Sequence, residues 1–358
     1  MKKNNSHPDT PACLDYEDDE RQASLETEIG VVYKKSIGSA VVHSNGRVIL
    51  CSLSNRLRKQ LIYAQSDGGS GHRSVRQVKE LAHNDPIAVG DQVRFIRADD
   101  VAGRIIEVLP RRSQMTRRSA VPMPGAHPFE QVIVANLDQV VPVFAAAQPA
   151  PKWGLLDRYL VSAEASGLPA LICITKLDLA TGRDREINAD LLDAVQTYRR
   201  VGYTVVLTST VTGDGMDELR LALNGRSSAL LGKSGVGKTS LLNTLQPGLG
   251  LRVNQVNERT GKGKHTTTGL EMFPLNGNDG SGTIVDTPGI REFGLWDVDG
   301  EDLAHYFPEM RLLVGRCRFG LDCRHDEEPG CAIRKAVTEG QISPHRYRSL
   351  RVLMEETT

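Results

Sequence analysis

The feature that most constrains this chain is a glycine-rich loop set between a short apolar run and a helical pattern. The loop fits G-x-x-x-x-G-K-[ST] without a gap and reads Gly232-Lys233-Ser234-Gly235-Val236-Gly237-Lys238-Thr239-Ser240. Glycines allow the tight turn that points successive N–H groups at a phosphate, and the following helix adds partial positive charge at its N-terminus. We therefore predict a nucleotide-phosphate site, with Lys238 at the β- and γ-phosphates and Thr239 on Mg²⁺. A glycine-rich turn with a chance lysine is the alternative, which the flanking strand and helix disfavour.

A second motif lies upstream and bears on the choice of base. An apolar run, residues 171–174, leads into Thr175-Lys176-Leu177-Asp178. This T-K-x-D resembles the N-K-x-D motif of GTPases, in which the Asp carboxylate accepts two hydrogen bonds from guanine and the Lys stem packs on the base. Because adenine offers no matching pair of donors, Asp178 should select guanine. Thr175 stands where Asn is usual, so we expect lower affinity with unchanged base selection; the alternative is an Asp that only caps the next helix.

Further segments complete the resemblance to a GTPase. The strand-like run 282–285 ends in D-T-P-G, where Asp286 and Gly289 resemble the residues that contact Mg²⁺ through water and sense the γ-phosphate. The segment 261–268 resembles a switch loop, and we assign Thr267 as its Mg²⁺ ligand, with Thr266 and Thr268 as alternatives. Ser209, in Thr208-Ser209-Thr210, resembles the small-residue loop that packs on guanine.

The order of these motifs is unusual. GTPases ordinarily begin with the phosphate loop and end with the guanine motif, whereas here the guanine motif comes first, then the phosphate loop, the switch and D-T-P-G. The set is therefore circularly permuted, which a compact α/β domain tolerates when the original termini lie close together.

Composition places the chain among ordinary globular proteins of two or three domains. It has 358 residues, of which 39% are hydrophobic and 25% charged, with a formal net charge of zero. No apolar run approaches 18 residues and no signal-peptide core is present, so we expect no membrane partner and a cytoplasmic location. With six cysteines and no export signal, thiols are expected rather than disulfides.

Five segments follow from the pattern along the chain. Residues 1–34 are predicted as a disordered acidic arm. Residues 35–112 hold five short β-type runs, among them 60–64, and predict an OB-fold barrel that binds RNA or merely has a solvated surface. Residues 113–130 are predicted as a linker. Arginines at and inside its start would suit RNA phosphates: Arg111, Arg112, Arg117 and Arg118.

Residues 131–295 alternate apolar runs with helical patterns. This alternation predicts a parallel sheet with helices on both faces, and thus an α/β fold. Ligands of such sheets bind at the carboxyl ends of the strands. T-K-L-D, T-S-T, the phosphate loop and D-T-P-G all fall at predicted strand ends, so we expect them to meet around one nucleotide.

The tail, residues 296–358, is predicted as a zinc-binding helical domain. Three cysteines and a histidine lie within 15 residues and form a Cys₃His ligand set: Cys317, Cys323, His325 and Cys331. Four protein ligands indicate a structural rather than a catalytic metal. A chance cluster of cysteines is the alternative. The last helix carries Arg346, Arg348 and Arg351, which we expect on a basic surface suited to RNA.

Barrel, permuted GTPase and C-x₅-C-x-H-x₅-C tail together resemble the ribosome small-subunit-dependent GTPase A family, over about residues 35–355. The resemblance implies a GTP hydrolase that acts late in maturation of the small ribosomal subunit, with one structural Zn²⁺ and with Mg²⁺ bound alongside GTP. It also implies ribosomal RNA, the small subunit and an assembly factor as partners, GTP and GDP as ligands, and a monomer. The acidic arm is not part of the family pattern.

The catalytic residues are the least determined. Ile290 stands where Ras-like enzymes carry a water-orienting glutamine, so the isolated protein should be slow. We assign the water to His265, together with Lys238 at the phosphates; an exposed loop histidine is the alternative. Two other functions stay open: an RNA-binding nucleotide switch with negligible turnover, and a kinase or ATPase using the same loop.

Overall fold

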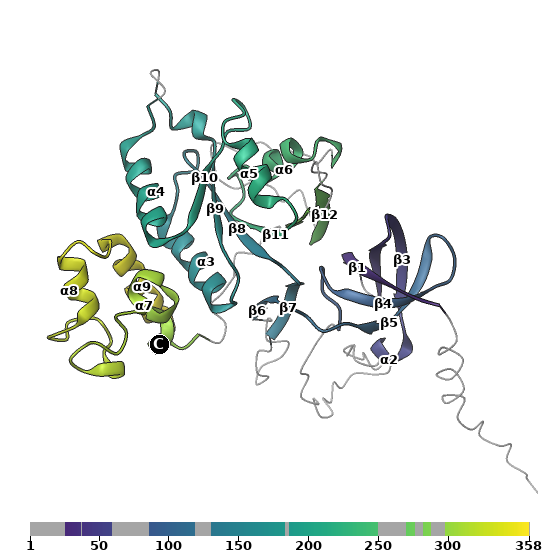
Figure 1. The fold of residues 1–358 in the computed structure, drawn as a ribbon, viewed down its shortest axis with the longest axis horizontal. Coiled ribbons are helices and arrows are strands. Elements are labelled where there is room, and N and C mark those ends of the chain that lie inside the picture. Colours follow the sequence, from purple (N-terminus) through teal and green to yellow (C-terminus); the bar gives the residue numbers. More distant parts are fainter. Residues whose placement is uncertain are drawn as a thin grey trace, which may run out of the picture.

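The computed structural model describes residues 26–36, 38–58, 86–118, 130–182, 186–249, 270–275, 282–287 and 298–357. These stretches form an N-terminal barrel, a central α/β unit and a C-terminal helical subdomain (Figure 1). Several predictions lie outside the described residues: the arm up to residue 25, the run 60–64, His265, Thr266 to Thr268, and Gly289.

The N-terminal unit is a closed, OB-like barrel, as predicted. Its strands are β1 (Thr27–Ser36), β2 (Ser39–Ser44), β3 (Arg47–Leu53), β4 (Gln92–Arg97) and β5 (Ala102–Val108), with a short helix α2 (Asn55–Arg58) after β3. The barrel closes because β1 pairs with both β2 and β4, while β5 pairs with β3 and β4. Alternate side chains such as Val42, Ile49 and Phe95 fill its interior with no exposed area.

Strand β1 is a correction to the sequence prediction. It begins at Thr27, inside the stretch assigned to the arm, and it supplies the pairing that closes the barrel. Thr27, Lys34 and Ser36 on this strand are exposed polar residues. Together with the acidic sequence before the strand, they obscure the alternation of apolar and polar residues by which a strand is recognised.

The central unit is a parallel sheet covered on both faces, as predicted. The parallel strands lie in the order β10 (Thr204–Leu207), β9 (Leu171–Thr175), β8 (Gln139–Ala145), β11 (Ser227–Leu231) and β13 (Gly282–Asp286). One core contains side chains of helices α3 (Trp153–Ala165) and α4 (Ala189–Val201); a second contains those of α5 (Met216–Leu223) and α6 (Lys238–Leu245). Strand β8 contributes Val140 and Phe144 to the first core and Val141 and Val143 to the second, as the period of two requires.

Further strands extend or flank this sheet. β12 (Glu271–Leu275) is antiparallel to β13, and β1 of the barrel pairs with β12 at Lys34 and Glu271. β6 (Gln114–Arg118) and β7 (Glu130–Ala135) form a separate antiparallel pair. The predicted linker therefore contains a strand, and β7 does not join the parallel sheet.

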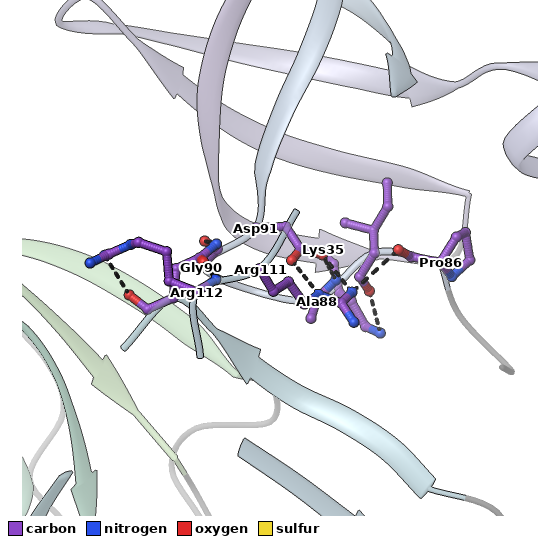
Figure 2. A network of polar contacts seen from close by, with 9 residues as sticks. Lys35, Pro86, Ala88, Gly90, Asp91, Arg111 and Arg112 are labelled. Carbon is purple, nitrogen blue, oxygen red and sulfur yellow. Dashed lines mark hydrogen bonds and ion pairs between the residues drawn. The ribbon is translucent and has the colours of Figure 1, made fainter. Parts of the chain in front are cut away.

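The barrel meets the central unit at a polar junction (Figure 2). Arg111 donates to the buried Asp91 through Nε at 2.7 Å and Nη2 at 2.9 Å. The same carboxylate accepts from the Ala88 N–H, and the Asn136 side chain donates to the Gly90 carbonyl at 2.9 Å. Arg111, predicted to face RNA, thus has a structural partner. Arg112 also pairs, with Asp138 at 3.2 Å, although its side chain is largely exposed.

The C-terminal subdomain consists of short helices: η3 (Gly300–Tyr306), α7 (Pro308–Arg311), η4 (Gly320–Asp322), α8 (Ala332–Thr338) and α9 (Pro344–Thr357). Arg346 on α9 has no exposed area and reaches Asp157 on α3 at 2.6 Å and Glu309 on α7 at 2.6 Å. The expectation that Arg346 faces solvent is therefore wrong, because the buried Asp157 and the mostly buried Glu309 hold it inside. Along the described stretches, no helix is both long and apolar enough to cross a membrane.

Candidate nucleotide site and metal centre

The predicted nucleotide motifs follow neighbouring strands of the parallel sheet at their carboxyl ends. Thr175 is the last residue of β9, Ser209 follows β10, the phosphate loop follows β11, and Asp286 ends β13. In the sheet these strands are joined through β8, which lies between β9 and β11. Parallel strands present their carboxyl ends at one edge, so segments up to 111 residue positions apart along the chain face one region.

The guanine-motif carboxylate is held by the small-residue loop. Ser209 has no exposed area, and its Oγ donates to Asp178 Oδ1 at 2.6 Å. The same Oγ accepts from the N–H groups of Val211 and Thr212, both at 3.2 Å. Because both N–H groups donate to the Ser209 oxygen, the hydroxyl proton is directed to Asp178. Ser209 thereby fixes the orientation of the carboxylate that would read the base.

Thr175 and Lys176 tie the guanine motif to the phosphate loop. The Thr175 hydroxyl is buried and contacts the carbonyls of Val236 and, at 3.3 Å, Phe144. Lys176 adopts the left-handed conformation, with φ of 56°, and its Nζ donates to the Gly235 carbonyl at 2.8 Å. The sequence predicted a weakened guanine contact at Thr175. The geometry gives this hydroxyl a further role, because it touches the loop that would hold the phosphates.

The phosphate loop has the close approaches that its glycines permit. A Cβ on Gly232 would lie 2.5 Å from the Val143 carbonyl oxygen, which requires glycine there. Gly235 and Gly237 have φ of 85° and 100°. Gly237 precedes α6, so Lys238 and Thr239 occupy the first turn of a helix, the position suited to binding an anion.

Lys238 is a partly buried cation whose side chain folds over its own loop. Its Nζ donates to the carbonyls of Gly232 and, at 3.1 Å, of Lys233. Burial lowers the pKa of Lys238, and the nearby Asp286 carboxylate partly opposes this shift. Burial likewise lowers the pKa of Lys176, and the nearby Asp178 carboxylate partly opposes this shift. A nucleotide phosphate would supply the negative charge that favours the protonated form of Lys238.

One neighbour of the site was not found from the sequence. The Gln148 carbonyl, in the loop after β8, accepts a hydrogen bond from Lys176. No motif marks Gln148; its only signal is that it follows a strand whose carboxyl end lies at the site edge. Of the predicted catalytic and magnesium residues, Lys238, Thr239 and Asp286 are among the described residues. His265 and Thr267 lie outside them, as does Gly289, which was predicted to bind GTP.

The four predicted zinc ligands come together in the C-terminal subdomain. Cys317, Cys323, His325 and Cys331 are buried, and their ligand atoms all lie within 4.8 Å of one another. His325 Nδ1 is 3.6 Å from Cys317 Sγ and 3.5 Å from Cys331 Sγ, and those sulfurs are 3.9 Å apart. Ligands around a tetrahedral zinc, with bonds of about 2.0–2.3 Å, are separated by about 3.4–3.8 Å, so the cluster has the size of a zinc site.

Hydrogen bonds to the sulfurs support the same assignment. The N–H of Ala332 donates to Cys317 Sγ at 3.3 Å and that of Arg334 to Cys331 Sγ at 3.5 Å. The Tyr347 hydroxyl donates to the His325 carbonyl at 2.6 Å and holds the left-handed turn that carries the histidine. N–H donors at sulfur favour thiolates, the form that binds metal.

A parallel sheet with a guanine motif before its phosphate loop, flanked by a barrel and a Cys₃His subdomain, defines a circularly permuted GTPase. The solved structures agree. The chain matches YjeQ from Thermotoga maritima with a TM-score of 0.67 and 30% identity, covering 93% of this chain and 99% of that one. It matches YloQ, described as a circularly permuted GTPase, with a TM-score of 0.63 and 28% identity, covering 93% and 95%.

The RsgA GTPase family model matches residues 108–296, more than half of the chain. Curated relatives named small ribosomal subunit biogenesis GTPase RsgA align over most of both chains. The protein of Gemmatimonas aurantiaca is 46% identical, covering 78% of this chain and 88% of its own. That of Pseudomonas aeruginosa is 42% identical, covering 76% and 77%. The chain belongs to the RsgA GTPase family, whose members are GTP hydrolases.

Proposed function

We propose that the chain binds GTP with Mg²⁺ across the carboxyl ends of β9, β10, β11 and β13 and hydrolyses it. The observation that carries this proposal is the contact between the two reversed motifs, where Lys176 Nζ donates to the Gly235 carbonyl at 2.8 Å. The base-reading and phosphate-holding segments therefore serve one nucleotide. We assign nucleotide binding to Thr175, Lys176, Asp178, Ser209, residues 232–240, Asp286 and Gly289.

The base assignment is tested by Asp178→Asn. Guanine offers two N–H donors to a carboxylate, whereas xanthine carries an oxygen at position 2, which an amide N–H can meet. The variant should lose GTP affinity and gain affinity for xanthosine triphosphate. Asp214→Asn is the matched control, because Asp214 is exposed nearby and accepts from Thr212. A D178N protein that still prefers GTP would contradict the assignment.

In the proposed reaction, water attacks the γ-phosphate and the β–γ bond breaks. Lys238 binds the β- and γ-phosphates, and Thr239, Asp286 and Thr267 would hold the Mg²⁺, which neutralises phosphate charge when bound. We assign the orientation of the attacking water to His265. His265→Ala should lower turnover while GTP affinity stays nearly unchanged, as mant-GTP titration would measure. Unchanged turnover at saturating GTP would exclude His265 from this role.

We further propose that this GTPase acts in maturation of the small ribosomal subunit, in the cytoplasm, and contacts ribosomal RNA. The names of its relatives support this partner. Phosphate release should rise when small subunits are added, and co-sedimentation with them should be stronger with a non-hydrolysable GTP analogue than with GDP. Release unaffected by subunits would refute stimulation. GTP-dependent co-sedimentation with negligible release would favour the nucleotide-switch alternative.

The domain assignments follow the same reasoning. We assign nucleotide chemistry to residues 131–295 and zinc binding to residues 296–358. One structural Zn²⁺ held by the Cys₃His set is supported by the mutual distances of its ligand atoms. A monomer that meets an assembly factor on the ribosome is proposed from the family resemblance, and sedimentation velocity of the purified protein tests the monomer.

A further inference from the structure

The barrel carries an apolar patch on its outer surface that its own fold leaves uncovered. Val48 and Leu50 on β3 and Val101 just before β5 are 55%, 58% and 66% exposed. Val48 and Leu50 flank the buried Ile49 and so point outward from the barrel, and the Leu50 N–H donates to the Val101 carbonyl at 2.7 Å, which brings the Val101 backbone alongside them. Neighbouring exposed apolar side chains on the outside of a barrel indicate a binding surface.

Arginines border this patch. Arg47 begins β3, beside Val48, and Arg104 on β5 pairs in register with Ser52, next along β3 from the patch. Both are exposed and make no ion pair within the described part of the chain. The surface therefore combines apolar side chains with exposed positive charge.

The N-terminal segment leaves the barrel at this border. Thr27 pairs with Ile96 on β4, and Ile96 pairs with Arg104 on β5. On the other side, Ser44 Oγ donates to the Ile29 carbonyl at 2.8 Å, and Ser44 pairs with Arg47. The chain before Thr27 thus starts within about two strand spacings, roughly 10 Å, of Arg104.

The sequence of that segment complements the surface. Residues 14–20 read Leu-Asp-Tyr-Glu-Asp-Asp-Glu, with five acids in seven positions together with a leucine and a tyrosine. Five residues, 21–25, lie between Glu20 and Glu26, so an extended chain from one to the other spans roughly 20 Å, enough to cross three strands. Residues 14–20 can therefore reach the patch from the point where the chain leaves the barrel.

We propose that residues 14–20 dock on this patch of the same molecule. Acidic side chains meet Arg47 and Arg104, and Leu14 and Tyr16 pack on Val48, Leu50 and Val101. A second copy of the chain is a weaker candidate, because the tethered segment is present at a high effective concentration beside the patch. Docking covers this face of the barrel and so limits what else can bind there.

The test uses the full chain with a spin label on Cys13. The other five cysteines are buried, which protects them from the labelling reagent. The label should weaken the methyl NMR signals of Val48, Leu50 and Val101. Signals of Leu312 and Leu321, exposed in the C-terminal subdomain at the opposite end of the molecule (Figure 1), should keep their intensity.

Two variants and a mixing experiment complete the test. Arg47→Glu with Arg104→Glu should restore the three methyl signals, and adding Asp18→Lys with Asp19→Lys should weaken them again. Equal signal intensity with and without the label would overturn the proposal. So would weakening that appears only when labelled and isotope-enriched molecules are mixed, because the occupant would then be a second copy.

Discussion

Replacing Arg346 by methionine should destabilise the protein by about 3–5 kcal/mol, the typical cost of removing one partner from a buried ion pair. Arg346 is fully buried between Asp157, which is also fully buried, and Glu309. Methionine keeps an unbranched apolar stem against Phe307 and Tyr198, whose ring centres lie 4.5 and 5.6 Å from the guanidinium carbon. The loss is therefore mainly that of charge and hydrogen bonds.

The pH dependence identifies the cause. Burial by itself raises the pKa of Asp157, but Arg346 and the hydrogen bonds around it hold that pKa below its ordinary value. In the native protein, stability from Asp157 is present above its unfolded pKa and is lost as pH falls through its folded pKa. Without Arg346, burial should dominate and raise the pKa, so the penalty in the variant should shrink on acidification as the carboxyl becomes protonated.

Urea unfolding followed by Trp153 fluorescence measures this effect, because Trp153 packs against Tyr198, which donates to Asp157. Arg351→Met is the matched control. Arg351 lies on the same helix and pairs with the exposed Asp326, so its loss should cost about 1 kcal/mol or less. Equal penalties for the two variants, or an R346M penalty that is the same at neutral and mildly acidic pH, would refute the buried-charge explanation.

Three other outcomes follow from the structure. Gly90→Ala should disrupt the junction between the barrel and the central unit, because the new Cβ would lie 2.1 Å from the Ala135 carbonyl oxygen. Gly38→Ala is the control, since its Cβ meets no atom within 4 Å, and thermal unfolding compares the two variants. Thr175→Val should weaken GTP and GDP binding alike by about 1 kcal/mol, because the hydroxyl contacts the Val236 carbonyl rather than reading the γ-phosphate; calorimetric titration measures both. Chelation of zinc should unfold the C-terminal subdomain before the parallel sheet, which circular dichroism with metal analysis would follow; simultaneous unfolding would contradict this.

The central sheet and its site could be predicted because their signals are local. The phosphate loop, T-K-x-D and D-T-P-G each sit next to a short apolar run, and strand and motif are read within a dozen residues. One general rule, that ligands bind at the carboxyl ends of parallel strands, then brings them together. The contact between Ser209 and Asp178 at 2.6 Å is what that rule leads one to expect.

The remaining features depend on contacts between distant residues. Strand β12 has only five residues, and one of them is Pro274, which argues against a strand. Its sequence is therefore too short and irregular to be recognised, and its pairing with β13 is what defines it. Arg346 lies in a helix with Arg348 and Arg351, and nothing within that helix distinguishes the buried arginine from the others. Its burial follows from Asp157, 189 positions earlier, and Glu309. A sequence pattern predicts which face of a helix is polar, but it does not predict which charged side chain on the helix has a buried partner.

The two flanking units are attached to the GTPase by different interactions, and this bears on how each could respond to nucleotide. The C-terminal subdomain is fixed to α3 by a buried charge network, which has few alternative arrangements because any shift exposes unpaired charge to a nonpolar interior. The barrel is attached at the Arg111–Asp91 junction and, through β1, at one bridge to β12, whose paired residues Lys34 and Glu271 also form a half-exposed ion pair of 3.1 Å. β12 in turn pairs along its length with β13, which ends at Asp286. An exposed ion pair contributes little, so the contact between β1 and β12 can change at low cost. Movement at the D-T-P-G end of β13 would therefore reach the barrel more readily than the C-terminal subdomain.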